Sequence, residues 1–147
     1  MTRQDPKIPD DDRYTAGMKV RRAVLGDDHV DRSIAATTRF TAAFQEYVTG
    51  SAWNDVWSRP GLDRRTRSAI TLAVLTAIRA EGEIPMHVRA AIRNGLTPDE
   101  IAEVLLHTAV YAGIPAANTA FRIAEETLGS AATGAPVPPS EDASGQR

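Results

Sequence analysis

The sequence contains no cysteine. This absence excludes disulfide bonds, thiolate metal ligands and thiol nucleophiles, and it is compatible with a reducing compartment. An excess of basic residues is also missing, because 17 Lys and Arg face 19 Asp and Glu and the formal net charge is −2. Proteins that bind nucleic acid through its phosphates need such an excess. The composition therefore argues against a nucleic-acid partner.

Long apolar segments are absent as well. The N-terminal residues 1–13 are polar and lack the apolar core of a secretory signal. The longest apolar run, residues 69–78, is interrupted by Thr71 and Thr76, is flanked by arginines and is too short to span a bilayer. These features predict a cytoplasmic protein that does not enter a membrane.

Apolar alternation with a period of two is missing, whereas Ala-rich segments with helical spacing recur. We predict an all-α, single-domain bundle over residues 13–129, preceded by an N-terminal extension (1–12) and followed by a disordered tail (130–147). About six helices joined by short loops are expected, at residues 13–25, 31–48, 64–80, 85–93, 98–112 and 115–128.

Local signals support these helices. Asp63 is placed to cap the helix that begins at Arg64, and Thr97 and Glu100 have the spacing of a capping box. Trp53 and Trp57 are four residues apart, so a helical turn would stack them as packing residues. The helix at 64–80 is apolar almost all round, which is typical of a central helix or a subunit interface. We therefore expect a homo-oligomer.

His87 is the strongest candidate for chemistry. If Pro85 is the first helical residue, His87 lies in the first turn, where the helix dipole disfavours imidazolium. A neutral imidazole there could exchange a proton or hydrogen-bond an oxyanion. Spacing alone slightly favours the alternative, a core histidine that donates to a backbone carbonyl. Glu83, four residues earlier, could orient His87, act as the acid itself, or be a solvated carboxylate.

The other two histidines have weaker claims. His107 lies between Leu106 and Thr108, near Tyr111, which predicts partial burial. A core or interface role is favoured for it, with substrate binding as the alternative. His29 is interpreted as a solvated loop residue. Without a carboxylate at ligand spacing, these histidines predict no metal site.

Arginines suit the binding of carboxylates, because a guanidinium group can hold a carboxylate through two hydrogen bonds. They are concentrated before and at the start of the helix at 64–80, and again in the helix that contains His87. Ion pairing with nearby acids is the favoured alternative for any single arginine. The candidates for substrate binding are Arg64, Arg67 and Arg89.

Five blocks of sequence resemble the carboxymuconolactone decarboxylase family, in its 4-carboxymuconolactone decarboxylase branch. They are AGMKVRR at 16–22, FQE at 44–46, WSRPGLDRRTRS at 57–68, HVRAAIRNG at 87–95 and AVYAGIPAAN at 109–118. The resemblance covers roughly residues 10–128. It implies an all-α, alkylhydroperoxidase D-like fold and a homo-oligomer, a trimer or a hexamer, that shares helices across its interfaces.

Redox-active members of the wider family carry a Cys-x-x-Cys-x-x-x-His pattern and a glutamate nineteen residues before that histidine. His87 matches the histidine, but Ala80 and Glu83 occupy the cysteine positions and Ser68 the glutamate position. Peroxidase chemistry is therefore excluded. The decarboxylase branch also lacks the cysteine pair, so the departure favours that branch.

The resemblance implies conversion of 4-carboxymuconolactone, a small dianionic lactone, to β-ketoadipate enol-lactone and carbon dioxide in protocatechuate catabolism, without a cofactor. In this interpretation His87 and Glu83 are catalytic, and Arg64, Arg67, Arg89 and His107 are candidates for substrate binding. Two alternatives remain at this point. One is a lyase or isomerase for another small lactone or keto acid, and the other is a non-catalytic helical oligomer or binding module.

Overall fold

The structure, a computed structural model, describes residues 12–134. These residues form helices and no strand, which confirms the predicted all-α class. The first half contains α1 (Asp12–Leu25), α2 (Asp27–Ala35), α3 (Ala42–Val48) and the π-helical segment η1 (Thr49–Trp57). The second half contains α4 (Arg64–Ala77), the short 3-10 helix η2 (Glu81–Glu83), α5 (Ile84–Arg93), α6 (Pro98–Ala112), α7 (Ile114–Leu128) and α8 (Ser130–Thr133).

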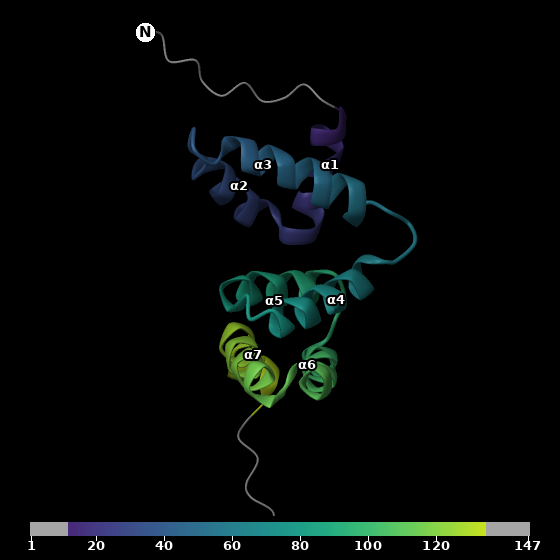
Figure 1. The fold of residues 1–147 in the computed structure, drawn as a ribbon, viewed down its shortest axis with the longest axis vertical. Helices are drawn as coiled ribbons and strands as arrows, with labels where there is room; N and C mark the ends of the chain where they lie inside the picture. The colour runs from purple at the N-terminus through teal and green to yellow at the C-terminus, as the bar shows by residue number, and fades with distance from the viewer. Residues whose placement is uncertain (1–11, 135–147) are drawn as a thin grey trace, which may run out of the picture.

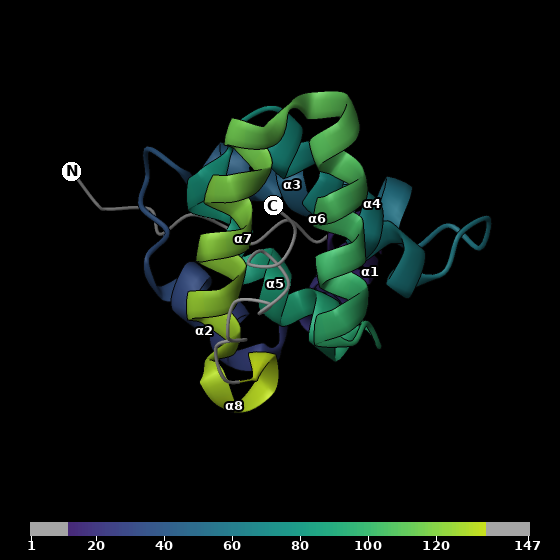
Figure 2. The same ribbon diagram turned by 90° about the horizontal axis from the view of Figure 1, so that it is seen from below.

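The two halves form two layers joined by residues 58–63 (Figure 1). In the C-terminal layer α6 and α7 lie side by side, with α5 behind them (Figure 2). The main apolar core fills the space between α4, α5, α6 and α7 and includes Leu72, Ile84, Val88, Ile101 and Leu105. A smaller cluster joins Val24 of α1, Trp53 of η1 and Ala90 of α5. Helix α5 therefore contributes to both cores and connects the layers.

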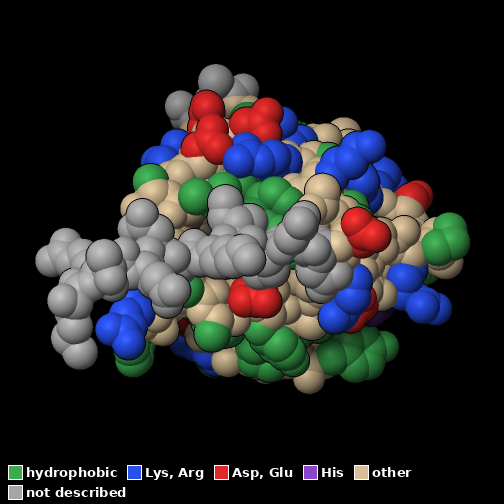
Figure 3. Space-filling model, turned by 90° about the horizontal axis from the view of Figure 1, so that it is seen from above, with side chains coloured by type: hydrophobic (Ala, Val, Ile, Leu, Met, Phe, Trp, Pro, Cys, Tyr) green, Lys and Arg blue, Asp and Glu red, His purple; other side chains and the backbone are tan. Residues whose placement is uncertain are grey.

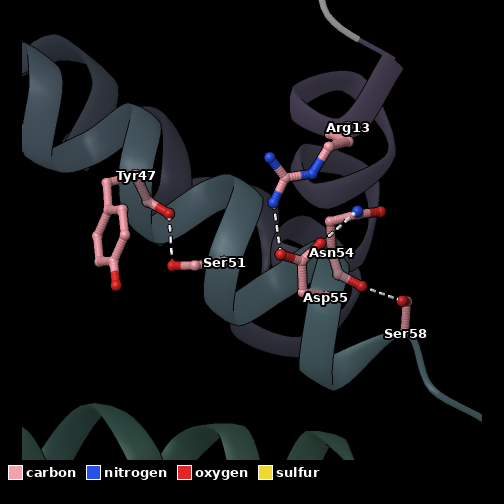
Figure 4. Close-up of polar contacts among 6 residues, drawn as sticks. All are labelled: Arg13, Tyr47, Ser51, Asn54, Asp55 and Ser58. Carbon is pink, nitrogen blue, oxygen red and sulfur yellow. Dashed lines mark hydrogen bonds and ion pairs between the residues drawn. The ribbon is translucent and has the colours of Figure 1, made fainter.

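Polar contacts tie α1 to η1 within the N-terminal layer (Figure 4). Arg13 forms an ion pair with Asp55, and Asn54 donates a hydrogen bond to the same carboxylate. The rings of Trp53 and Trp57 lie 5.3 Å apart between centroids, which confirms the predicted stacking. Figure 3 views this layer from above and shows hydrophobic surface among the charged side chains.

The prediction of one helix over residues 31–48 is wrong. The chain forms α2, then a turn at residues 36–41, then α3. Within this turn the Thr41 hydroxyl accepts from the Thr38 amide at 2.9 Å, and the Thr37 hydroxyl donates to the Ser33 carbonyl at 2.9 Å. Threonine side chains that bond to nearby backbone groups compete with helical hydrogen bonds, and here they accompany the break.

Helix α4 also differs from its prediction. It ends at Ala77 rather than near Ala80, and Arg79 adopts a left-handed φ of 61° beyond its end. The helix is not central, because Leu72 and Thr76 are buried whereas Ile70 and Val74 face outward. The sequence predicts either a central helix or a subunit interface for this segment. An outward apolar stripe fits a subunit interface better than a core position.

The predicted helix ends are largely as expected. The Asp63 carboxylate accepts from the Thr66 amide at 2.7 Å, and the Thr97 hydroxyl accepts from the Glu100 amide at 3.1 Å. Ser130–Thr133 form α8 instead of the start of a disordered tail. The rest of the predicted tail, residues 135–147, and the extension up to residue 11 lie outside the described residues.

No helix among residues 12–134 has both the length and the apolar character needed to cross a membrane.

Candidate active site

His87 lies near the start of α5. Ile84 is the first helical residue, so His87 is the fourth residue of the helix. The sequence predicted the third position. Its Nδ1 atom is buried and has no hydrogen-bond partner among residues 12–134, while the side chain as a whole is half-buried. An unpaired buried nitrogen is costly, by about 1–3 kcal/mol.

Burial lowers the pKa of His87 below its usual value. The Glu83 carboxylate acts in the opposite direction, and His29 lowers the pKa further. The imidazole is therefore predominantly neutral at pH 7. The sequence predicts a neutral ring because of the helix dipole. In the structure, the larger cause of the lowered pKa is desolvation of the ring.

Glu83 is the residue before the first turn of α5. Its side chain is exposed and makes no capping hydrogen bond to the helix amides. No hydrogen bond joins it to His87 among the described residues, so within one chain its influence on the ring is purely electrostatic. The two predicted catalytic residues are therefore not hydrogen-bonded to each other among the described residues, and the Glu83 carboxylate only raises the pKa of His87.

A pocket of about 380 Å³ opens between α5 and the junction of α1 and α2. Met86, the neighbour of His87, lines it, as does the predicted substrate-binding residue Arg89. The remaining lining residues are Leu25, Gly26, Asp28, His29, Arg32, Ile92 and Arg93. This volume is in the range of small-molecule sites. The pocket combines a hydrophobic wall with three guanidinium groups, which suits a small anion.

The interpretation of His29 as a solvated loop residue is wrong. His29 lies in α2, is half-buried and lines this pocket. Burial lowers its pKa, and the nearby arginines Arg32, Arg21 and Arg89 lower it further. The sequence did contain a signal: Gly26 followed by Asp27 and Asp28 is typical of a helix that begins after a glycine.

Arg64 and Arg67 lie at the other end of the α4–α5 pair. The Asn94 amide donates to the Ser68 hydroxyl at 2.9 Å, which fixes the start of α4 beside the end of α5. Asn94 lies seven residues beyond His87, about 10 Å along a helix. Arg67 donates to the Arg59 carbonyl at 3.2 Å. Within one chain, these two arginines are therefore not brought next to His87.

His107 is exposed on α6, contrary to the predicted partial burial. Its ring lies 5.2 Å from that of Tyr111 between centroids, tilted by 40°. Side chains on the outer surface of α6 cannot meet His87 of the same chain. A second hollow of about 340 Å³ between α6 and α7, lined by Ile101, Leu105 and Phe121 among others, contains no histidine.

Arg21, which the sequence does not single out, is only 6% exposed. Its guanidinium donates to Ser33 and Gln45 at 3.0 Å and to Thr49 at 3.4 Å, all neutral oxygens. It thereby links α1 to α2, α3 and η1 behind the pocket. Its side-chain Nε is buried without a partner among the described residues, and burial lowers the pKa of the group.

The fold and the site together define an all-α protein with a neutral histidine near a helix start and a basic pocket beside it. Residues 42–126 match the carboxymuconolactone decarboxylase family. This match spans more than half of the 147 residues, so the chain belongs to that family.

Two relatives align over most of the chain. A 4-carboxymuconolactone decarboxylase from Acinetobacter baylyi is 50% identical over 119 residues, which are 81% of this chain and 89% of the relative. The nitrosuccinic acid decarboxylase npaB from Metarhizium robertsii is 43% identical over 115 residues, 78% of this chain and 80% of the relative. A 4-carboxymuconolactone decarboxylase from Pseudomonas putida is 56% identical over 43 residues, 29% of this chain and 90% of the relative.

Proposed function

We propose that the protein is a carboxy-lyase that converts 4-carboxymuconolactone to β-ketoadipate enol-lactone and carbon dioxide in the cytoplasm, as a step of protocatechuate catabolism. The observation that carries this proposal is the 50% identity to a 4-carboxymuconolactone decarboxylase over 81% of the chain. The neutral His87 beside a basic pocket supports it, because the substrate is a dianion and the reaction develops negative charge on an oxygen.

The substrate explains why such a reaction needs no cofactor. The departing carboxylate sits on a ring carbon that is conjugated through a double bond to the lactone carbonyl. When the carbon–carbon bond to that carboxylate breaks, its electron pair moves to the carbonyl oxygen and carbon dioxide leaves. A proton then adds to the carbon next to the carbonyl. The protein has to hold the substrate, stabilise the oxyanion and supply the proton.

His87 is proposed to interact with the lactone carbonyl. A neutral imidazole can donate its N–H to the developing oxyanion. Delivery of the proton to carbon by the same ring is the second possible role. Glu83 orients or polarises His87 through its charge, or acts as the acid.

Arg89 is the proposed carboxylate ligand, because it lies on the same helix as His87 and lines the adjacent pocket. Arg64, Arg67 and His107 stay candidates only if a second subunit brings them to this site. Their positions away from His87 make their role a question of quaternary structure.

We propose that the chain forms a homo-oligomer, a trimer or a hexamer, through the outer faces of α4 and α6. These helices pack against each other, and both expose apolar stripes. Val74 of α4 is 49% exposed, and Val110 and Tyr111 of α6 are 76% and 80% exposed. Exposed apolar surface of this kind is typical of subunit interfaces. Replacing Val110 with Glu should yield smaller particles in light scattering; an unchanged mass would contradict this interface.

The relative named nitrosuccinic acid decarboxylase supports a second candidate reaction, decarboxylation of a nitro-substituted dicarboxylic acid. A nitro group can accept the electron pair of the broken bond, as the lactone carbonyl does. Both candidates share a small polyanion with a built-in electron sink. The alternative of a non-catalytic helical oligomer predicts filled apolar space around His87; His87 lines neither the α5 pocket nor the hollow between α6 and α7, but its neighbour Met86 lines the first.

The test is release of carbon dioxide from each substrate by the purified wild type. Because 4-carboxymuconolactone is labile, a cycloisomerase should generate it in the same vessel. Turnover of the lactone at a kcat/KM at least about tenfold above that of nitrosuccinate supports the first proposal. The reverse order supports the second, and no release from either contradicts both.

A further inference from the structure

The three arginines that line the α5 pocket share one cavity, and none of them has a carboxylate partner among the described residues. Arg32, Arg89 and Arg93 have no ion pair within residues 12–134. Five other arginines do form ion pairs with carboxylates: Arg13, Arg22, Arg65, Arg79 and Arg122. Acidic residues are therefore available to the fold, but they are used elsewhere.

Helix α2 illustrates how the acids are distributed. Asp27 and Asp31 both bind Arg22, at 3.1 and 2.8 Å, on the side of α2 that faces α1. Asp28 is the one carboxylate among the pocket-lining residues, against three guanidinium groups. The pocket therefore keeps a net positive charge, and a dianion would neutralise it.

The backbone at Gly26 lets one of these arginines approach. Gly26 is buried with φ of 88°, and a Cβ built on it would lie 2.5 Å from Nη2 and 2.9 Å from Cζ of Arg93. The guanidinium thus lies directly over the α1–α2 junction, in space that only glycine leaves open. Arg93 of α5 therefore lies against the α1–α2 junction, in a pocket that Arg32 of α2 also lines.

His29 adds a neutral group to the lining of the pocket. Burial and the nearby Arg32 lower its pKa, so at pH 7 the ring is predominantly neutral. A neutral imidazole can donate one hydrogen bond to a carboxylate without adding to the repulsion between the guanidinium groups. Arg89, four residues before Arg93, lies on the same face of α5 and also lines the pocket.

We infer that Arg32, Arg93 and His29 form a second carboxylate subsite across the α2–α5 boundary, which makes the site selective for dianions. The inference rests on the proposed function and deepens it, because Arg89 and His87 would hold the reacting half of the substrate and this subsite the other carboxylate. Specificity then resides partly in α2, a helix that supplies none of the predicted catalytic residues.

The test is a binding measurement that needs no turnover. Succinate and its monomethyl ester have similar size and differ by one charge, so calorimetric titration of the full chain with each probe gives a dianion preference. We expect wild type to prefer succinate about tenfold, because one charge-assisted contact is worth roughly that factor. Arg32→Gln and Arg93→Gln should each reduce the preference to about twofold or less.

Arg122→Gln is the matched control, because Arg122 lies on α7 and pairs with Glu126 at 3.4 Å. It should keep the wild-type preference. Circular dichroism verifies the fold of each variant, and Arg93→Lys provides a milder change if Arg93→Gln does not fold. A wild type without preference, or folded Arg32→Gln and Arg93→Gln variants that retain it, would overturn the inference.

Failure of the proposed function gives a different pattern. If wild type prefers succinate and the variants lose that preference, the proposed subsite is supported even when neither candidate substrate releases carbon dioxide. If wild type decarboxylates the lactone while the variants keep their dianion preference, the proposed reaction is supported and the proposed subsite is contradicted.

Discussion

Two groups of arginines lie near α5, one at the start of α4 and one in the pocket between α2 and α5, and they differ in their partners. The group at the start of α4 is conspicuous in the sequence, yet Arg65 binds Glu100 and the Gly95 carbonyl, and Arg67 bonds to the Arg59 carbonyl. The pocket group is inconspicuous, because Arg32 and Arg89 are far apart in sequence. Its members have no ion pair among residues 12–134. An ion pair therefore occupies Arg65 at the start of α4, whereas Arg64 and the three pocket arginines have none among the described residues. A run of arginines in the sequence does not show which of them the fold leaves without an ion pair.

The largest effect should come from the histidine beside the pocket group. Replacing His87 with Ala should lower kcat/KM for 4-carboxymuconolactone about 100-fold or more, because an oxyanion or proton-transfer contact is lost. Stopped-flow or continuous assays of carbon dioxide release measure this effect. The melting temperature should change little, since the ring is only half-buried and its Nδ1 has no partner among the described residues. A variant with turnover within twofold of wild type would show that His87 does not act in the reaction.

A direct comparison of the two arginine groups uses Arg89→Gln and Arg65→Gln. The first should raise KM about tenfold with little change in unfolding free energy, because Arg89 has no ion pair to lose. The second should leave KM unchanged and cost at most about 1 kcal/mol, because its ion pair with Glu100 is partly exposed. Steady-state kinetics and urea denaturation separate the two outcomes. Equal effects of both variants on KM would remove the distinction between the groups.

Gly26→Ala sharpens the comparison at the pocket group alone. The new methyl group would collide with the Arg93 guanidinium, and the φ of 88° is strained for alanine. We expect a loss of about 1–3 kcal/mol in the free energy of unfolding, together with weaker succinate binding. Chemical denaturation and calorimetry test both parts. Unchanged succinate affinity in a destabilised variant would separate the role of Gly26 in the backbone from any role in placing Arg93.

The smallest expected effect is on stability as pH changes. The pKa values of His87 and His29 are lowered in the folded state, so the unfolded chain binds protons more readily around and below the ordinary value of about 6.5. The stability due to these two groups is therefore present above pH 6.5 and is lost as pH falls towards their folded-state pKa values. Urea denaturation of wild type and of His29→Gln with His87→Gln tests this: the double variant should lose less stability between pH 7 and 5. An equal loss in both would contradict it.

Much of the fold follows from local sequence signals. Asp63, Thr97 and Gly95 end or begin helices as expected, because caps and left-handed glycines act within a few residues. The break between α2 and α3 was missed, because Thr37 and Thr38 also fit a helical stripe and only their side-chain bonds reveal the turn.

The site was less predictable. Arg89 lies two residues after His87 on α5, and Glu83 lies just before that helix, so the sequence already places the three near one another along the chain; their roles remain predictions. The approach of His29 and Arg32 to α5 depends on how two layers pack, which the periodicity of a single helix does not specify. Whether Arg64, Arg67 and His107 bind substrate remains a prediction that depends on the assembly of subunits.

His87 and the α2–α5 pocket are proposed to form one site. The most direct measurement is the rate of carbon dioxide release over a range of 4-carboxymuconolactone concentrations at several fixed concentrations of succinate. We expect purely competitive inhibition by succinate, with an inhibition constant equal to the dissociation constant from calorimetry. In Arg32→Gln the inhibition constant of succinate should rise about tenfold. Succinate that binds in calorimetry but leaves KM for the lactone unchanged would place the pocket and the reaction at separate sites and contradict the claim.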